Sequence, residues 1–145
     1  MAKTPPPSAA AGYSGKPLIA KLGWKPDMTS VAIAPPANYA ELVDAAPIAI
    51  AKAAPTSGAY GFIHLFVGND SELARLLPAL EPRLIEGGMI WVSWPKKTSA
   101  LFKDLTEDGI RAIALPMGLV DVKVCAVDAD WSGLKLLRRK VGSSA

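Results

Sequence analysis

Short apolar runs bounded by proline and glycine predict the strands of this chain. Residues 62–67 are continuously apolar except for His64, which is the pattern of a strand buried on both faces of a parallel sheet. Residues 29–34 form a second compact run, and Pro35 and Pro36 end it because neither can donate a hydrogen bond to a neighbouring strand. The same criteria predict further strands at residues 47–51, 89–94, 119–127 and 134–138.

Helical spacing and capping residues predict helices between these strands. A short helix over residues 16–22 ends at Gly23, which can adopt the left-handed conformation of a C-cap. Asn38 is expected to cap a helix that runs to about residue 44. Thr106, followed by two acidic residues, opens the last helix with a cap and charges that suit the helix dipole.

The strongest helical signal follows the buried strand at residues 62–67. Asp70 or Ser71 is expected to cap this helix. Pro78 and Pro82 are expected to kink or split it, and the glycine pair at 87–88 is expected to stop it. The leucines that recur at helical spacing are Leu73, Leu76, Leu77, Leu80 and Leu84.

The connections between the predicted elements indicate the fold class. Only about six residues, 128–133, join the last two strands, which is too few for a crossover, so this pair is predicted to be an antiparallel hairpin. The alternating strands and helices before it are typical of an α/β sheet with helices on both faces. Residues 12–140 are therefore predicted to form one three-layer domain, flanked by disordered tails at 1–11 and 141–145.

Composition supports one globular domain and narrows the possible partners. The chain of 145 residues is 50% hydrophobic and 20% charged, which excludes an intrinsically disordered protein. Its net charge of +3 is too small to imply nucleic-acid binding. The longest apolar run, residues 60–67, is far shorter than the ~20 residues of a membrane-spanning helix, and no secretory signal is recognisable at the N-terminus. We expect a cytoplasmic protein with no membrane partner.

Five short strings carry a family resemblance. Two of them span residues 91–97 and 118–128, and their specific parts are Ser-Trp-Pro-Lys-Lys at 93–97 and Val-Lys-Val-Cys-Ala-Val-Asp at 122–128. Together with Gly-Tyr-Ser-Gly at 12–15, Asp-Leu-Thr-Glu at 104–107 and Trp-Ser-Gly-Leu-Lys at 131–135, they resemble a family of small bacterial proteins known as a domain of unknown function. The resemblance spans nearly all of the predicted domain and implies no established activity.

A more distant resemblance is to the Rossmann-like fold of class I methyltransferases, which bind S-adenosylmethionine. The helix, glycine pair and strand of residues 84–92 look like the fourth unit of that fold, and its closing antiparallel hairpin matches the predicted one. The resemblance implies a six-stranded, mostly parallel sheet in the order 2-1-3-4-6-5, with only the last strand antiparallel. It also implies a cofactor over the carboxyl ends of the first strands, where open α/β sheets bind ligands.

The chain departs from the methyltransferase pattern at that cofactor position. The turn after the first strand should be glycine-rich, so that backbone can approach the cofactor, yet residues 34–38 read Ala-Pro-Pro-Ala-Asn. The second strand should end in an acid that holds the ribose hydroxyls, yet residues 51–53 read Ala-Lys-Ala. The third strand is followed by Asp70, without the Pro-Pro-aromatic signature of amino-methylating members. We therefore predict no bound cofactor.

A candidate ligand site lies where the fourth strand ends. If the turn of the closing hairpin lies at the same carboxyl edge, charged, hydroxyl and aromatic side chains converge there, as is typical of a small-molecule pocket. The predicted ligand-binding residues are Ser93, Trp94, Lys96, Lys97, Asp130, Trp131 and Ser132. The alternative is a plain strand end with two solvated lysines. Lys52 is expected at the same edge.

Other reactive residues favour structural interpretations. His64 is expected to be a buried, neutral imidazole that is satisfied by one backbone or side-chain partner. Cys125 is expected to be a small core residue, and one histidine with one cysteine essentially excludes a metal site. The sequence contains no nucleophile elbow, dinucleotide fingerprint or Walker loop. The basic cluster at residues 138–140 favours a solvated strand end.

These observations favour a protein without catalytic activity, or with little, that binds a small anionic ligand or a protein partner at the carboxyl edge of the sheet. The alternative is an S-adenosylmethionine-dependent methyltransferase with an atypical cofactor pocket. A nucleic-acid binder is a third hypothesis, for which affinity would fall steeply with salt.

Overall fold

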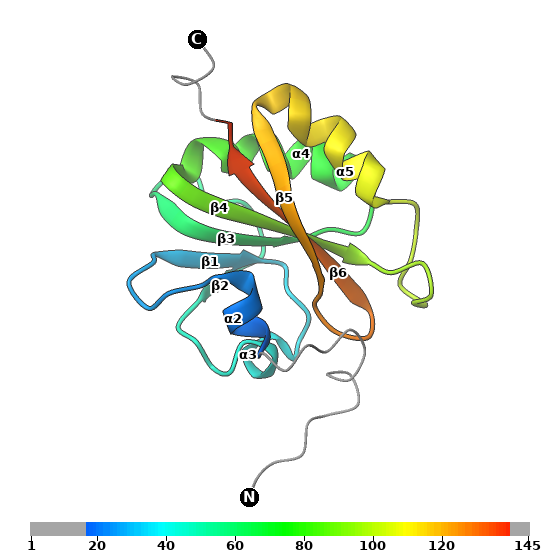
Figure 1. The fold of residues 1–145 in the computed structure, drawn as a ribbon, viewed down its shortest axis with the longest axis horizontal. Coiled ribbons are helices and arrows are strands. Elements are labelled where there is room, and N and C mark those ends of the chain that lie inside the picture. The colour runs from blue at the N-terminus through cyan, green and yellow to red at the C-terminus, as the bar shows by residue number, and fades with distance from the viewer. Residues whose placement is uncertain (1–16, 140–145) are drawn as a thin grey trace, which may run out of the picture.

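A computed structural model describes residues 17–139, and Figure 1 shows its fold. The tails expected at 1–11 and 141–145 lie outside the described residues. The strands of the sheet are β1 (Ser30–Ile33), β2 (Ala49–Ala51), β3 (Tyr60–Phe66), β4 (Leu84–Pro95), β5 (Leu119–Ala126) and β6 (Trp131–Arg138). The helices are α2 (Leu18–Leu22), α3 (Tyr39–Leu42), α4 (Asp70–Leu80) and α5 (Glu107–Ala114), with short 3₁₀ turns at Glu81–Arg83 and Leu115–Met117.

The six strands form one sheet in the order β2-β1-β3-β4-β6-β5, as predicted. β1 pairs in parallel with β2 and β3, and β3 pairs in parallel with β4. β6 is antiparallel to both β4 and β5, which confirms the closing hairpin. The carboxyl ends of β1 to β4 therefore share one edge of the sheet, and the β5–β6 turn lies at that edge.

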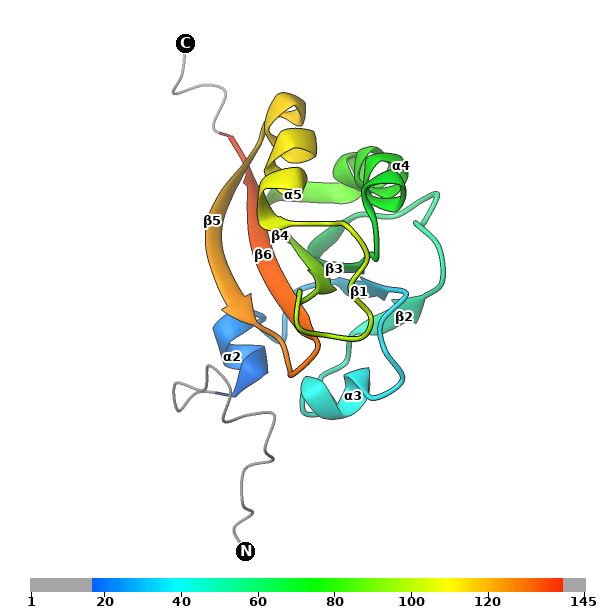
Figure 2. The same cartoon turned by 90° about the vertical axis from the view of Figure 1, so that its right-hand side faces the viewer.

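Two hydrophobic clusters lie on opposite faces of the sheet, as the views in Figures 1 and 2 allow the reader to follow. α4 and α5 pack on one face through leucines such as Leu73 and Leu77 and through Ile110. α2 and α3 cover the other face, where Leu22 and Tyr39 are fully buried. Because both faces are covered, β3 and β4 are buried almost throughout, which explains their apolar sequences.

The start of α4 differs from the expectation. Asn69, rather than Asp70 or Ser71, is the N-cap, and its Oδ1 accepts a hydrogen bond from the Glu72 backbone N–H at 2.8 Å. α4 also ends at Leu80, earlier than the spacing of the leucines predicted. Pro78 is tolerated on an exposed position near the C-terminal end, and the following 3₁₀ turn accommodates Pro82 where a missing N–H costs little.

The glycine pair at 87–88 has a different role from the predicted helix stop, because β4 already begins at Leu84. Leu84 pairs with Tyr60, and the next pair joins Met89 to Phe62, so β4 carries extra residues in a bulge. Gly87 has a φ of 81°, which favours glycine. A Cβ on Gly88 would lie 2.8 Å from the Leu84 side chain and 3.1 Å from the Gly61 carbonyl oxygen.

The elements that follow β1 are short. α3 is a single turn of four residues, and Asn38 is its N-cap, as predicted, although the Asn38 side chain makes no capping hydrogen bond. β2 has three residues and lies at the edge of the sheet, where the Ile50 side chain is 61% exposed. The carboxyl edge is therefore built on long strands at β3 and β4 and on short elements at β1 and β2.

Candidate functional site

The two segments of the predicted ligand site meet at the carboxyl edge. Trp94 pairs with Ser132 and Pro95 with Trp131 in the β4–β6 ladder. Beyond the ladder, the Lys96 backbone N–H donates to the Asp130 carbonyl oxygen at 2.8 Å. The expected adjacency of the β4 end and the β5–β6 turn is thus present.

The strands place the four predicted residues of β4 and β6 on both faces of the sheet, so the seven predicted residues do not share one pocket. The Ser93 hydroxyl contacts His64, and Trp131 packs edge-on against Phe66 with ring centroids 5.0 Å apart, both on the α3 face. Trp94 lies in the cluster on the α4–α5 face. Neighbouring side chains of a strand point to opposite faces, which separates Ser93 from Trp94.

Asp130 has a different partner from the expected ligand. Its exposed carboxylate accepts a hydrogen bond from the Ser99 hydroxyl at 2.9 Å, which joins the β5–β6 turn to the loop after β4. The turn itself is shaped by Asp128, whose Oδ1 accepts from the backbone N–H groups of Asp130 and Trp131. Ligand binding by the seven residues stays a prediction.

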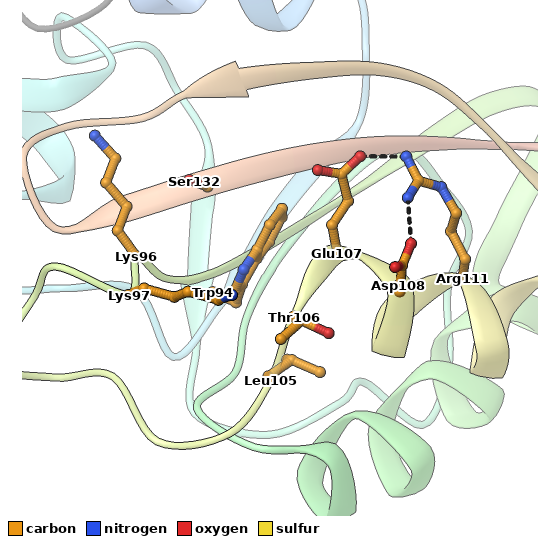
Figure 3. Close-up of a pocket in the computed structure, with 9 residues that line it drawn as sticks. All are labelled: Trp94, Lys96, Lys97, Leu105, Thr106, Glu107, Asp108, Arg111 and Ser132. Carbon is orange, nitrogen blue, oxygen red and sulfur yellow. Dashed lines mark hydrogen bonds and ion pairs between the residues drawn. The ribbon is translucent and has the colours of Figure 1, made fainter.

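Four of the predicted residues do line one pocket, on the α4–α5 face at the end of β4. Its volume of about 490 Å³ lies within the range of small-molecule sites. Figure 3 shows the pocket between the end of β4 and the start of α5. The lining residues that were predicted are Trp94, Lys96, Lys97 and Ser132. The others are Leu105, Thr106, Glu107, Asp108 and Arg111.

The start of α5 holds one side of this pocket in a fixed arrangement. The Thr106 hydroxyl accepts from the Gly109 backbone N–H at 3.1 Å, as the predicted cap should. The Arg111 guanidinium donates to Glu107, to Asp108 at 3.0 Å and to Asp121 of β5, where its Nε lies 2.7 Å from Oδ2. The hydrogen bond with Asp121, and next that with Glu107, raises the pKa of Arg111, and the hydrogen bond from Arg111 lowers the pKa of Asp121.

Sequence reasoning treated the acids of α5 only as favourable to its dipole and missed the contact with β5. The spacing of Glu107 and Arg111 by four residues could have indicated their pairing along the helix. The partner on β5, Asp121, requires knowledge of the packing of α5 against the sheet.

A buried polar chain lies on the opposite face of the sheet. Tyr39 Oη lies 2.9 Å from His64 Nδ1, and His64 Nε2 lies 2.7 Å from Ser93 Oγ. The His64 ring stacks on Phe66 with centroids 4.3 Å apart. Burial lowers the pKa of His64 to about 3 and raises the pKa of Tyr39. His64 is therefore a buried, neutral core residue, as predicted, and it has two hydrogen-bond partners where one was expected.

Cys125 lies partly buried beside the core cluster of the α3 face. Burial raises the pKa of its thiol, although Lys21 and Lys123 oppose this effect. A thiol that is protonated at neutral pH is a weak nucleophile, in agreement with a packing role.

The turn after β1 lies where methyltransferases of this fold are expected to hold S-adenosylmethionine. Ala34 has a φ of 55°, so the turn keeps a left-handed conformation that normally favours glycine. Pro35 and Pro36 offer no backbone N–H to a ligand, and β2 is followed by the exposed cation Lys52 rather than by an acid. These residues do not fit the cofactor in the pose usual for this fold.

Comparisons with known proteins define the class of fold. No protein-family model and no curated protein matches the chain. The ribosomal protein L11 methylase from Lactobacillus delbrueckii subsp. bulgaricus is similar with a TM-score of 0.58 and 16% identity, over 85% of this chain and 76% of that one. Magnesium protoporphyrin IX methyltransferase from Synechocystis, solved with bound S-adenosylmethionine, gives 0.58 and 13% identity, over 83% and 76%.

A third similar structure is an S-adenosylmethionine-dependent methyltransferase from Clostridium acetobutylicum, with a TM-score of 0.52 and 8% identity, over 77% of this chain and 76% of that one. Such low identities establish the fold alone. The chain therefore has a Rossmann-like, methyltransferase-like fold. The more specific resemblance to a small bacterial family stays a prediction.

Residues 17–139 contain no group of three histidine, cysteine or acidic side chains that could hold a metal ion. Over the same span, every helix is too short or too polar to cross a membrane.

Proposed function

We propose that the protein is an S-adenosylmethionine-dependent methyltransferase with an atypical cofactor pocket. The observation that carries the proposal is the sheet order β2-β1-β3-β4-β6-β5 with its antiparallel β6, in a fold shared with methyltransferases. This comparison favours methyl transfer over the non-catalytic function that the sequence favoured. We also propose that the protein is cytoplasmic, as the sequence predicts.

The turn after β1 supports the proposal in its backbone and opposes it in its side chains. Ala34 has a positive φ, a backbone conformation that a glycine at this position would also adopt. The prolines and Lys52 remove the usual contacts to the methionine part and the ribose of the cofactor. No step of a methyl transfer is therefore derived from these residues, and direct binding is the decisive measurement.

Titration calorimetry of the full chain with S-adenosylmethionine tests the proposal. We expect saturable binding at micromolar concentration. If the ribose lies at the end of β2, Lys52→Glu supplies the missing acid and tightens binding by roughly tenfold, the equivalent of one good hydrogen bond to a charged group. Lys25→Glu makes the same charge change in the exposed segment before β1, at the opposite edge, and leaves binding unchanged.

Absence of binding by both the natural chain and the Lys52→Glu variant would overturn this proposal. Tighter binding by the Lys25→Glu variant as well would show a general charge effect, and would remove the argument that the ribose lies at the end of β2.

The second candidate function is non-catalytic binding of a small anionic ligand or a protein partner at the carboxyl edge. The specific observation in its favour is the pocket beside Trp94, with Lys96 and Lys97 among its lining residues, combined with the missing cofactor contacts after β1. A chain that binds no S-adenosylmethionine but binds a small molecule in this pocket would support it.

A further inference from the structure

We propose that the pocket beside Trp94 binds a flat zwitterion, a small molecule with an anionic group at one end and a cationic group at the other. The inference concerns this pocket alone and holds whether or not the protein transfers methyl groups. It differs from a simple anion site, which the sequence indicated, because the pocket also has an acidic end.

The cationic end of the pocket consists of Lys96 and Lys97. The backbone hydrogen bond from Lys96 to Asp130 fixes the point where the chain leaves the sheet. None of the ion pairs that residues 17–139 form involves either lysine. Their charges are therefore available to an anionic group of a ligand.

The acidic end is formed by the first turn of α5. The Glu107 side chain is 40% exposed, and one of its carboxylate oxygens accepts a hydrogen bond from Arg111. Figure 3 shows its second oxygen turned away from Arg111, toward the side of the pocket where the lysines lie. Arg111 pairs with the carboxylates of Asp108 and Asp121 as well as with Glu107. One guanidinium therefore faces three carboxylates, and this end of the pocket keeps a net negative charge.

The Arg111 contacts also position Glu107. Arg111 also donates to Asp121 of β5, so the guanidinium is anchored to the sheet as well as to its own helix. A carboxylate that is held in place before a ligand arrives loses less conformational entropy on binding than a free side chain does.

The middle of the pocket is apolar. Trp94 is 7% exposed and Leu105 is 1% exposed, and in Figure 3 the Trp94 ring lies between the lysines and Glu107. An aromatic wall favours a flat ligand. Where the wall excludes water, the attraction between each charged group of the ligand and the protein charges at that end of the pocket is stronger. A dianion would be attracted by the lysines and repelled by the carboxylates, whereas a zwitterion satisfies both ends.

Rigid probes of matched size test the inference in the full chain. The zwitterions are 4-(aminomethyl)benzoate and its meta isomer, which sample two charge separations, and the single-charge controls are benzoate and benzylamine. By calorimetry we expect the better zwitterion to bind roughly tenfold tighter than either control, because it forms one additional charge contact.

Two variants assign the ends of the pocket. Glu107→Gln keeps an acceptor for Arg111 and should reduce zwitterion affinity to that of benzoate. Replacement of both Lys96 and Lys97 by Gln should reduce it to that of benzylamine. Glu86→Gln, at an exposed position in the β4 bulge, is the matched control and should keep the full preference. Unchanged circular dichroism and melting temperature will show that each variant is folded.

Three results would overturn the inference. Benzoate that binds as tightly as both zwitterions would make this a simple anion site, and benzylamine that does so would make it a cation site. Failure of every probe to saturate the natural chain would remove the zwitterion site. None of these results bears on S-adenosylmethionine binding after β1, which is measured separately.

Discussion

His64 shows how one polar residue is accommodated in an apolar strand. Both ring nitrogens have hydroxyl partners, one from α3 and one from β4, and the ring is fully buried. The sequence predicted burial and satisfaction because an unpartnered buried polar group is costly. It could not name Tyr39 and Ser93, since these partners are 25 and 29 residues away along the chain.

The burial of His64 predicts a pH dependence of stability. Its pKa falls from 6.5 to about 3 on folding, so below about pH 6.5 the unfolded chain binds a proton that the folded chain does not. Stability from this residue is therefore complete above that pH and is lost as the pH falls, by up to about 1.4 kcal/mol per pH unit. Urea denaturation between pH 7 and pH 5.5 measures it, because the chain contains 1 histidine.

His64→Gln is the control for this dependence. Glutamine can still hydrogen-bond within the core but does not titrate, so the variant should be less stable at pH 7 and should lack the slope in this window. An equal slope in both proteins would contradict the prediction.

The separation of Ser93 from Trp94 also belongs to the residue scale, and the sequence contained the signal for it. Alternation along a strand places neighbouring residues on opposite faces. Trp131 was assigned to a turn because the apolar run begins later, whereas β6 begins at Trp131 itself. Trp131 belongs to the ladder because it pairs with Pro95 of β4. The strand propensity of Trp131 alone does not reveal this pairing.

At the scale of elements, the β5–β6 hairpin contains an unfavourable pair. Lys123 and Lys135 lie directly opposite each other in the ladder. Burial, and next the charge of Lys123, lowers the pKa of Lys135. Lys123 Nζ also donates to the Lys21 carbonyl oxygen at 3.1 Å, on the exposed surface near the end of α2.

Lys123→Glu should stabilise the protein. The change replaces a like-charge pair with an opposite-charge pair across the strands, which is worth about 0.5–1 kcal/mol. The melting temperature should rise at low salt, and the gain should shrink at about 1 M salt because the charges are screened. Lys52→Glu, which makes the same change after β2, should give no comparable rise. A destabilised Lys123→Glu variant would show that the bond to Lys21 outweighs the repulsion.

Element types were predicted more reliably than their ends. Hydrophobic runs located all six strands, because burial on both faces leaves a strong pattern at β3 and β4. The bulge at Gly87 and Gly88 was mistaken for a helix stop because glycine serves both purposes, and only the pairing with β3 distinguishes them. The capping role of Asn69 was missed because three neighbouring residues could all accept the same hydrogen bond.

At the scale of the whole molecule, the strand order followed from the methyltransferase resemblance and the antiparallel hairpin followed from the length of its turn. The two-sided charge of the pocket could not be predicted, because its lysines follow β4 whereas Glu107 and Arg111 lie on α5. Their approach depends on how the loop after β4 returns to the sheet. The sequence could place only the lysine end of the pocket, because parallel strands share a carboxyl edge and the lysines directly follow β4.

The different lengths and burial of the elements predict which backbone amides of the free protein exchange fastest. β3 and β4 are long and buried, whereas α3 and β2 have four and three residues beside the exposed edge. Amide hydrogens of β3 and β4 should exchange slowest, and those between residues 34 and 52 should exchange among the fastest. Hydrogen exchange measured by mass spectrometry checks this order in the free protein.

The same measurement separates the two candidate sites. S-adenosylmethionine at the turn after β1 should slow exchange in residues 34–52, because a ligand that binds only the closed form opposes local opening. A zwitterion in the pocket should slow exchange in the loop after β4 and in the first turn of α5, and leave residues 34–52 unchanged. Protection by S-adenosylmethionine confined to that loop and α5 would instead move the cofactor to the pocket beside Trp94. The left-handed turn at Ala34 would then be an ordinary feature of the backbone, without a role in binding.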